Sequence, residues 1–228
     1  MTERWAQYIR NTIQEQGGFF QAALRSWQYA MPLAEAIRRA VPPPARILEV
    51  GCGAALLSIY LHHLGYEVTA MDEDPDVLEV ARETAEFFRA APTFTRGIAA
   101  DLRPHHGRFD LTFSEGVVEH YPRETTVALL REQARCSPAV LASIPTRHTP
   151  WIPGATDDAR FYSLRGLKTM IRDAGMDVVE SGAFCDVQSP LSVWLSRVMP
   201  LPLYRWTQRT FTLAVSVYCL GRVPHERG

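Results

Sequence analysis

The chain has 228 residues, of which 46% are hydrophobic and 21% charged, and its formal net charge is −1. A chain of this length and composition can bury a full core as a single globular domain. It has no basic excess to neutralise phosphates, so we expect no nucleic-acid partner. The four cysteines form no CxxC pair, which disfavours a disulfide framework or a zinc cluster and fits reduced, intracellular thiols.

Two further features favour a cytoplasmic protein without a transmembrane segment. The first residues are polar and lack the pattern of a secretory signal peptide. No apolar run approaches the ~20 residues that a membrane-spanning helix needs. The nearest candidate, residues 210–220, is too short.

Residues 3–40 have helical patterns in two stretches, 4–16 and 19–40, on either side of Gly17 and Gly18. Prolines at 42–44 then end the helix. Aromatic residues are dense in this segment, which predicts an N-terminal helical lid over residues 1–43 that closes over ligands and excludes water. The alternative is that these aromatics fill the core. The candidates for substrate contact here are Tyr8, Phe19, Phe20 and Trp27.

After the prolines, short apolar runs alternate with helical patterns. Strands are expected at 46–50, 67–71, 93–98, 109–113, 139–144, 176–183 and 211–220, and helices at 54–64, 76–89, 123–135 and 163–174. This alternation predicts an α/β fold with a doubly wound, seven-stranded, mostly parallel sheet. Within one domain, 1–228, we expect a lid (1–43), a cofactor-binding core (44–183), an apolar insertion (184–210) and a last strand with its tail (211–228).

The most informative feature is the glycine loop that directly follows the first strand. In open α/β sheets, ligands bind beyond the carboxyl ends of the strands, and glycines there let the backbone approach the ligand. A dinucleotide site should have the pattern GxGxxG, but Leu56 stands in place of the last glycine. Glu49 at the strand end could instead accept a hydrogen bond from an ammonium group.

The stretch Glu49-Val50-Gly51-Cys52-Gly53-Ala54-Ala55 resembles the first motif of class I S-adenosylmethionine-dependent methyltransferases. That motif is an acidic residue, any residue, then Gly-x-Gly-x-Gly, and Ala55 replaces the third glycine. The resemblance implies a Rossmann-like methyltransferase fold and S-adenosylmethionine as cofactor. It also implies that Glu49 faces the amine of the cofactor, with Gly51, Cys52 and Gly53 around it.

The resemblance continues into the next two motifs. The stretch ending at Asp72 is similar to the family's second strand, whose terminal acid binds both ribose hydroxyls, a role that suits a carboxylate. Glu73 would then lie against the adenine. Residues 99–102 look like the third motif, in which Asp101 would accept the adenine amino group and Leu102 would supply a backbone amide.

Residues 108–120 resemble the family's fourth strand and the loop that lines the methyl-transfer site. The resemblance implies cofactor contacts from Ser114, Glu115 and Gly116. His120 is a candidate general base, since its ordinary pKa lies near 6.5, and Glu119 would orient it or bind a substrate amine. Glu119-His120 would otherwise be a structural turn. Many methyl transfers need no base, because alignment with the sulfonium supplies much of the rate.

Other features bear on the acceptor and on partners. No metal site is expected, because the paired histidines at 62–63 and 105–106 lack accompanying carboxylates. Arg147, just past the fifth strand, and Trp194, in the insertion, are further candidates for substrate contact. The apolar insertion predicts a substrate cover, a dimer contact or a membrane-surface patch. Peripheral membrane contact through 190–209 therefore stays open, as do a monomer and a homodimer.

The apolar segments at both ends favour a small or medium, apolar or aromatic methyl acceptor. Our leading hypothesis is methylation of oxygen in secondary metabolism. A quinone or lipid methyltransferase and an N-methyltransferase are the close alternatives. Two other classes are a non-catalytic, methyltransferase-like subunit that binds a partner and a nicotinamide-dependent reductase.

Overall fold

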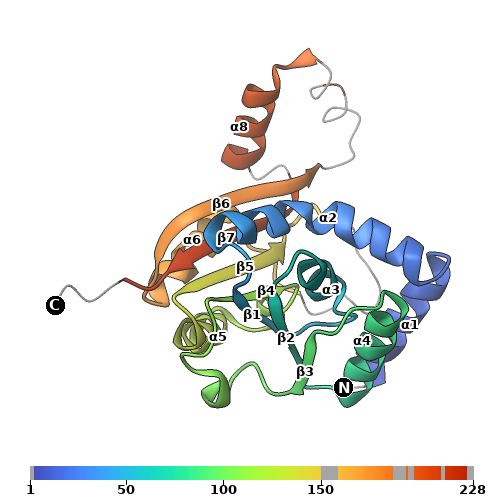
Figure 1. The fold of residues 1–228 in the computed structure, drawn as a ribbon. Helices are drawn as coiled ribbons and strands as arrows, with labels where there is room; N and C mark the ends of the chain where they lie inside the picture. Colours follow the sequence, from blue (N-terminus) through green and yellow to red (C-terminus); the bar gives the residue numbers. More distant parts are fainter. Residues whose placement is uncertain (1–2, 150–158, 187–193, 195–197, 212–213, 225–228) are drawn as a thin grey trace.

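The computed structural model describes residues 3–149, 159–186, 194, 198–211 and 214–224. Strands and helices alternate along most of the chain (Figure 1). In chain order they are α1 (Glu3–Glu15), α2 (Phe19–Ala40), β1 (Arg46–Val50), α3 (Leu56–His63), β2 (Glu67–Asp72), α4 (Pro75–Phe87), β3 (Thr93–Arg96), η1 (Arg103–His105), β4 (Leu111–Glu115), η2 (Val118–His120), α5 (Arg123–Cys136), β5 (Ala139–Pro145), α6 (Leu164–Asp173), β6 (Asp177–Asp186), α8 (Leu201–Phe211) and β7 (Ala214–Arg222).

The seven strands form one sheet in the order β3-β2-β1-β4-β5-β7-β6. The pairs β1–β2, β2–β3, β1–β4 and β4–β5 are parallel, whereas β7 is antiparallel to both β5 and β6. The predicted doubly wound, mostly parallel sheet is therefore confirmed. The chain turns from one half of the sheet to the other between β1 and β4, so the ligand crevice is expected beyond their carboxyl ends.

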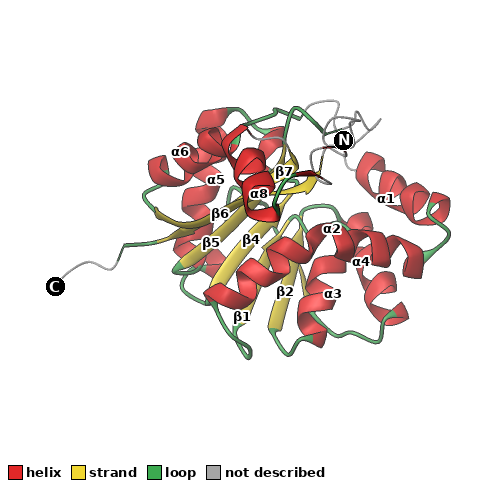
Figure 2. Ribbon diagram, turned by 90° about the horizontal axis from the view of Figure 1, so that it is seen from above, coloured by secondary structure: helices red, strands yellow, loops and turns green. Residues whose placement is uncertain are grey.

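Alternate residues of the central strands pack against helices on opposite faces, as the two-residue period of a strand requires. In β5, Leu141 packs in the cluster that contains α2 and α3, whereas Val140 and Ala142 pack against α5 and α6. Figure 2 shows α2, α3 and α4 on one side of the sheet and α5 and α6 on the other. Both faces are covered, which explains why the central strands are almost wholly apolar.

Helix α2 has a double role that refines the predicted lid. Its second half carries Leu33 and Ile37, both with 0% exposure, in the core cluster beneath the sheet. Its first half carries the exposed side chains of Phe20 and Leu24. The second half of α2 therefore belongs to the core, and the lid stays a prediction for α1 and the first turns of α2.

The C-terminal region differs from the prediction at its boundaries. The predicted insertion begins inside β6, which continues to Asp186, and it contains a helix, α8. Phe211, predicted to open the last strand, ends α8 instead, and β7 begins at Ala214. Alternation of apolar and polar residues over 211–220 suited both a strand and an amphipathic helix end, which caused the error.

Helix α8 stands apart from the layered core (Figure 1). Tyr204 is buried, while Leu201, Leu203 and Trp206 are largely exposed. Most of the residues between β6 and α8, including part of the predicted 190–209 membrane patch, lie outside the described residues. In the described part of the chain, no helix is long and apolar enough to cross a membrane.

The position of α2 leads to a stability prediction. Leu33→Ala should lower the free energy of unfolding by about 2–5 kcal/mol, because it leaves a cavity in a fully buried site. Leu24→Ala, on the exposed face of the same helix, should cost less than about 1 kcal/mol. Urea unfolding followed by circular dichroism measures both. Equal effects of the two substitutions would mean that α2 does not form part of the core.

Candidate active site

The glycine loop turns sharply between β1 and α3. Gly51 has a φ of +74°, and a Cβ there would lie 2.5 Å from a Val117 methyl carbon, so the position requires glycine. The amides of Gly51 and Cys52 donate hydrogen bonds to the carbonyl of Met71 at 2.8 and 3.0 Å. Ala55 has a φ of +54°, so it keeps the left-handed conformation that suits the glycine it replaces.

Glu49 lies at the end of β1 and is buried, with 4% exposure. Ser58, on α3, donates a hydrogen bond from its hydroxyl to the carboxyl group of Glu49. Burial, together with the nearby charges of Glu115 and Asp72, raises the pKa of Glu49 to about 8, although the hydrogen bond from Ser58 lowers it. Glu49 therefore tends to hold a proton at neutral pH until a cationic group approaches it.

Asp72 lies at the end of β2 and connects two neighbouring segments. One carboxylate oxygen accepts a hydrogen bond from the Gly53 amide at 3.3 Å, and the other accepts from the Asp74 amide at 3.1 Å. Burial raises the pKa of Asp72, although these two amides lower it. Glu73 is exposed, and its carbonyl accepts a hydrogen bond from Arg96. Asp72 thus fixes the glycine loop relative to the start of α4.

The predicted adenine contacts lie in the segment after β3. Asp101 is exposed, and both of its carboxylate oxygens accept hydrogen bonds from Arg103 at 2.7 Å. Hydrogen bonding from Arg103 lowers the pKa of Asp101 to about 2. Leu102 is fully buried in the cluster that contains Leu48 and Val50, on the face of the sheet opposite to α2. A ligand at Asp101 would therefore share the carboxylate with Arg103.

The fourth strand was predicted at 109–113 but spans Leu111–Glu115, so Ser114 and Glu115 form the end of β4 and only Gly116 follows it. Ser114 is buried and accepts a hydrogen bond from Gln133 of α5 at 3.2 Å, so its side chain serves the helix packing. Glu115 and Gly116 line a cavity beyond the carboxyl end of β4. Burial raises the pKa of Glu115 to about 7.

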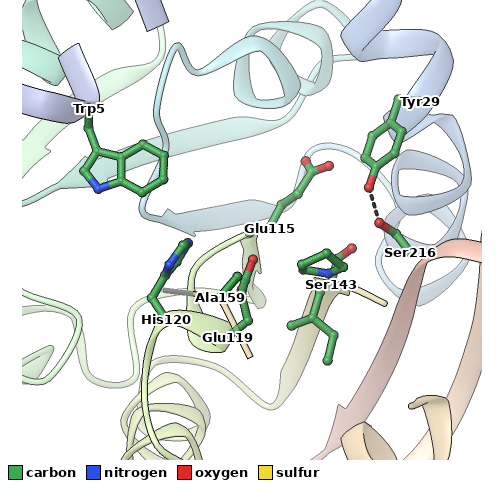
Figure 3. Close-up of a pocket in the computed structure, with 11 residues that line it drawn as sticks. Trp5, Tyr29, Glu115, Glu119, His120, Ser143, Ala159 and Ser216 are labelled. Carbon is green, nitrogen blue, oxygen red and sulfur yellow. Dashed lines mark hydrogen bonds between the residues drawn. The ribbon is translucent and has the colours of Figure 1, made fainter. Parts of the chain in front are cut away.

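This cavity, of about 230 Å³, joins segments that are far apart in the sequence (Figure 3). It brings Glu115 together with the two predicted catalytic residues, Glu119 and His120. Its walls come from α1, α2, η2, β5 and β7 as well as from β4. The lining residues are Trp5, Tyr29, Glu115, Gly116, Glu119, His120, Ser143, Ile144, Pro145, Ala159 and Ser216.

Sequence reasoning did not select Tyr29 or Ser216 for this site. Their hydroxyl groups form a hydrogen bond that joins α2 to β7 at the cavity wall (Figure 3). Burial raises the pKa of Tyr29, so this phenol stays protonated and can donate a hydrogen bond. The aromatic pattern of α2 included Tyr29, but only the antiparallel insertion of β7 beside β5 brings Ser216 to it.

Helix α1 covers both the glycine loop and the cavity. A Cβ at Gly53 would lie 3.8 Å from the end of the Ile9 side chain. Near one end of α1, the Trp5 ring packs edge-on against His120 with centroids 5.4 Å apart. Near the middle of α1, Arg10 forms an ion pair with Glu83 of α4 at 2.8 Å.

The six predicted substrate residues lie in other places. Only Tyr8 lines a described cavity, a second one between α1 and α2 that shares Tyr29 with the first. Phe19 packs against Phe87, and Trp27 donates a hydrogen bond to the Leu56 carbonyl. The side chains of Phe20, Arg147 and Trp194 are exposed.

Two other features of the site concern thiols and metals. Cys52 is buried in the glycine loop, and burial raises its thiol pKa well above the usual value, so it is not poised as a nucleophile. Among the described residues, no group of three or more histidine, cysteine and acidic side chains is arranged to hold a metal ion.

Comparison with known proteins shows that this chain is similar to methyltransferases. Residues 47–137 match the family model described as a methyltransferase domain. A ubiquinone biosynthesis O-methyltransferase of Cereibacter sphaeroides is 29% identical over 151 residues, which is 59% of this chain and 61% of that protein. A protein of the same name from Xanthomonas axonopodis is 30% identical over 157 residues, or 61% of this chain and 66% of that one. The chain thus matches less than two thirds of the length of these curated relatives.

Among solved structures, the magnesium protoporphyrin IX methyltransferase of Synechocystis with bound S-adenosylmethionine has the same fold. The TM-score is 0.63 at 16% identity, over 94% of this chain and 85% of that one. Residues 47–137 thus match a methyltransferase domain, and the chain has the fold of this S-adenosylmethionine-binding enzyme. The glycine loop and Asp72 lie within the matched residues, as do the residues that line the cavity directly after β4, namely Gly116, Glu119 and His120, with Glu115 at the end of that strand.

The protonation of Glu49 leads to a pH prediction. Between its ordinary pKa of 4.5 and its folded-state pKa of about 8, the folded protein holds a proton that the unfolded chain has lost. Stability should therefore fall as pH rises through this window. Glu49→Gln has no carboxyl group to titrate and should not lose this stability. The difference in free energy of unfolding between Glu49→Gln and the parent protein should therefore grow by on the order of 2 kcal/mol from pH 5.5 to pH 8.

Urea unfolding of both proteins across this pH range measures the difference. Glu124→Gln, at an exposed position on α5, is the matched control and should follow the parent protein at every pH. If Glu49→Gln also runs parallel to the parent protein, Glu49 is ionised in the folded state at neutral pH.

Proposed function

We propose that this protein transfers the methyl group of S-adenosylmethionine to a hydroxyl group of a small or medium aromatic acceptor. The observation that carries this proposal is the adjacency of two features at the switch point of the sheet. One is the acid-flanked glycine loop after β1, and the other is the cavity after β4 that combines aromatic walls with Glu115, Glu119 and His120.

The residues of the loop region fit the cofactor. S-Adenosylmethionine brings an ammonium group and a sulfonium that carries the transferable methyl group. The buried carboxyl group of Glu49 would hold the ammonium, and Asp72 would accept hydrogen bonds from the ribose hydroxyls while its backbone partners fix its position. Glu73, Asp101 and Leu102 remain proposed adenine contacts. Gly51 and Gly53 have no side chains, so the ligand could lie close to the backbone of the loop.

The cavity beyond β4 would hold the acceptor. Trp5 and Tyr29 offer faces for an aromatic ring, and the Tyr29 and Ser216 hydroxyls offer polar contacts. The printed names of the relatives, ubiquinone biosynthesis O-methyltransferase, support oxygen as the methylated atom and make a quinone-related phenol the first acceptor class to test. We further propose α1 as the lid, because it covers both the loop and the cavity.

A binding experiment tests the class of cofactor. S-Adenosylhomocysteine, the demethylated product, should raise the melting temperature of the protein in a thermal-shift assay, because it binds only the folded state. NADH at the same concentration should leave the melting temperature unchanged. Stabilisation by NADH alone would support a nicotinamide-dependent reductase. Stabilisation by S-adenosylhomocysteine without transfer to any phenol, amine or quinone acceptor would support a non-catalytic subunit.

A substitution tests the proposed ribose contact. Asp72→Asn should weaken S-adenosylhomocysteine binding by at least ~1 kcal/mol, about fivefold in Kd, because it replaces charged hydrogen bonds with neutral ones. Isothermal titration calorimetry measures the affinity. Glu67→Gln, at the exposed opposite end of the same strand, should bind like the parent protein. An unchanged Kd in Asp72→Asn would place the ribose elsewhere.

A further inference from the structure

Glu115 differs from the other acidic residues of the site. Its carboxyl group rises from the end of β4 into the cavity, between Trp5 and Tyr29 (Figure 3). Glu49 has the Ser58 hydroxyl as a hydrogen-bond donor, and Asp72 has two backbone amides. In the part of the chain that the structure describes, the Glu115 carboxyl group has no hydrogen bond and no ion pair.

A partly buried carboxyl group without a hydrogen-bond donor lowers stability, because it loses hydrogen bonds to water that no protein group replaces. The groups that face Glu115 do not remove this cost. They are Tyr29 from α2, Glu119 and His120 from η2, and Glu49 from the neighbouring strand β1. No lysine or arginine is among the described residues that line the cavity. A group held at such a cost, in a cavity beside a cofactor loop, is a candidate for chemistry.

We propose that Glu115 is the general base that takes the proton from the acceptor hydroxyl, and that this acceptor is a phenol. The inference rests on the proposed methyl transfer. In the step, the phenolic oxygen forms a bond to the methyl carbon while the methyl–sulfur bond breaks. The electron pair of that bond stays on sulfur, which becomes a neutral thioether, and the phenolic proton moves to the carboxylate of Glu115.

Electrostatics favours this assignment. The step neutralises one carboxylate and one sulfonium in a cavity with mostly apolar walls, where separated charges are costly. Burial places the pKa of Glu115 at about 7, which lies between that of an ordinary carboxylate and that of a phenol near 10 and suits a base that works at neutral pH. An amine acceptor would need no such base, because its proton is acidic after the transfer and leaves to water.

His120 is the competing base, and the geometry separates the two. The His120 ring packs edge-on against Trp5, so its side chain already serves a contact between η2 and the cover helix α1. Glu115 has no comparable contact among the described residues. We therefore assign to His120 the role of positioning α1 and the acceptor. Glu115 has the role of accepting the proton.

The test compares Glu115→Gln, Glu115→Asp and His120→Ala with the exposed control Glu124→Gln. Catechol and 4-methylcatechol serve as acceptors, and formation of S-adenosylhomocysteine is measured from pH 5.5 to 9. Glu115→Gln should lower kcat at least 100-fold and remove the fall in rate on the acidic side. Glu115→Asp should retain part of the rate. The rate of His120→Ala should still fall as the pH is lowered. Glu124→Gln should keep both the kcat and the S-adenosylhomocysteine affinity of the parent protein, the latter measured by calorimetry.

A second measurement does not depend on activity. Because burial raises the pKa of Glu115, the parent protein loses stability as pH rises from about 4.5 to 7. The melting temperature of Glu115→Gln should therefore exceed that of the parent protein at pH 8, with a smaller difference at pH 5.5. The Glu124→Gln control should show no such trend.

The outcomes separate this inference from the proposed function. Failure of the parent protein to bind S-adenosylhomocysteine would refute the proposed function itself. Binding without transfer to either catechol would remove the phenolic acceptor and the base role with it. Two results would overturn the assignment of Glu115. One is that Glu115→Gln still transfers the methyl group and its rate still falls at low pH. The other is that Glu115→Gln and the parent protein have equal melting temperatures at pH 8.

Discussion

The site depends on one electrostatic constraint, which is that three acidic side chains meet at the ends of adjacent parallel strands. Glu49, Asp72 and Glu115 end or nearly end β1, β2 and β4. Burial raises the pKa of each carboxyl group. The negative charges of Asp72 and Glu115 raise the pKa of Glu49 as well. Hydroxyl and backbone donors compensate the first two in part. The region is thus prepared for a ligand that brings positive charge, as a sulfonium with an ammonium group does.

The topology of the sheet explains how an acceptor cavity forms beside these acids. Because β7 inserts antiparallel between β5 and β6, its first residues lie at the carboxyl end of β5. Ser216 therefore lies opposite Pro145 in the register and reaches Tyr29 of α2. The same helix anchors its second half in the core. A rigid core helix thus supplies one wall of the cavity, while the separate helix α1 supplies the cover.

Local sequence signals predicted the sheet and the cofactor loop, because both arise from short patterns. Apolar runs with flanking glycines mark buried strands, and Glu49 with Gly51 and Gly53 forms one continuous motif. The acceptor wall could not be predicted in this way. Tyr29, Ser143 and Ser216 come from three distant segments, and only strand order and register bring them together. The end of α8 was missed because a few alternating residues fit a helix end as well as a strand.

The cover helix links the two halves of the site energetically. Ile9 lies over the glycine loop and Trp5 lines the cavity, so the proposed lid movement of α1 would open both at once. The ion pair of Arg10 with Glu83 is exposed, and such pairs contribute only about 0–1 kcal/mol. This ion pair therefore adds little to the cost of the proposed opening of α1. A bound cofactor and an aromatic acceptor would each add apolar contacts to the inner face of α1, so both ligands together would favour the closed position and the exclusion of water from Glu115.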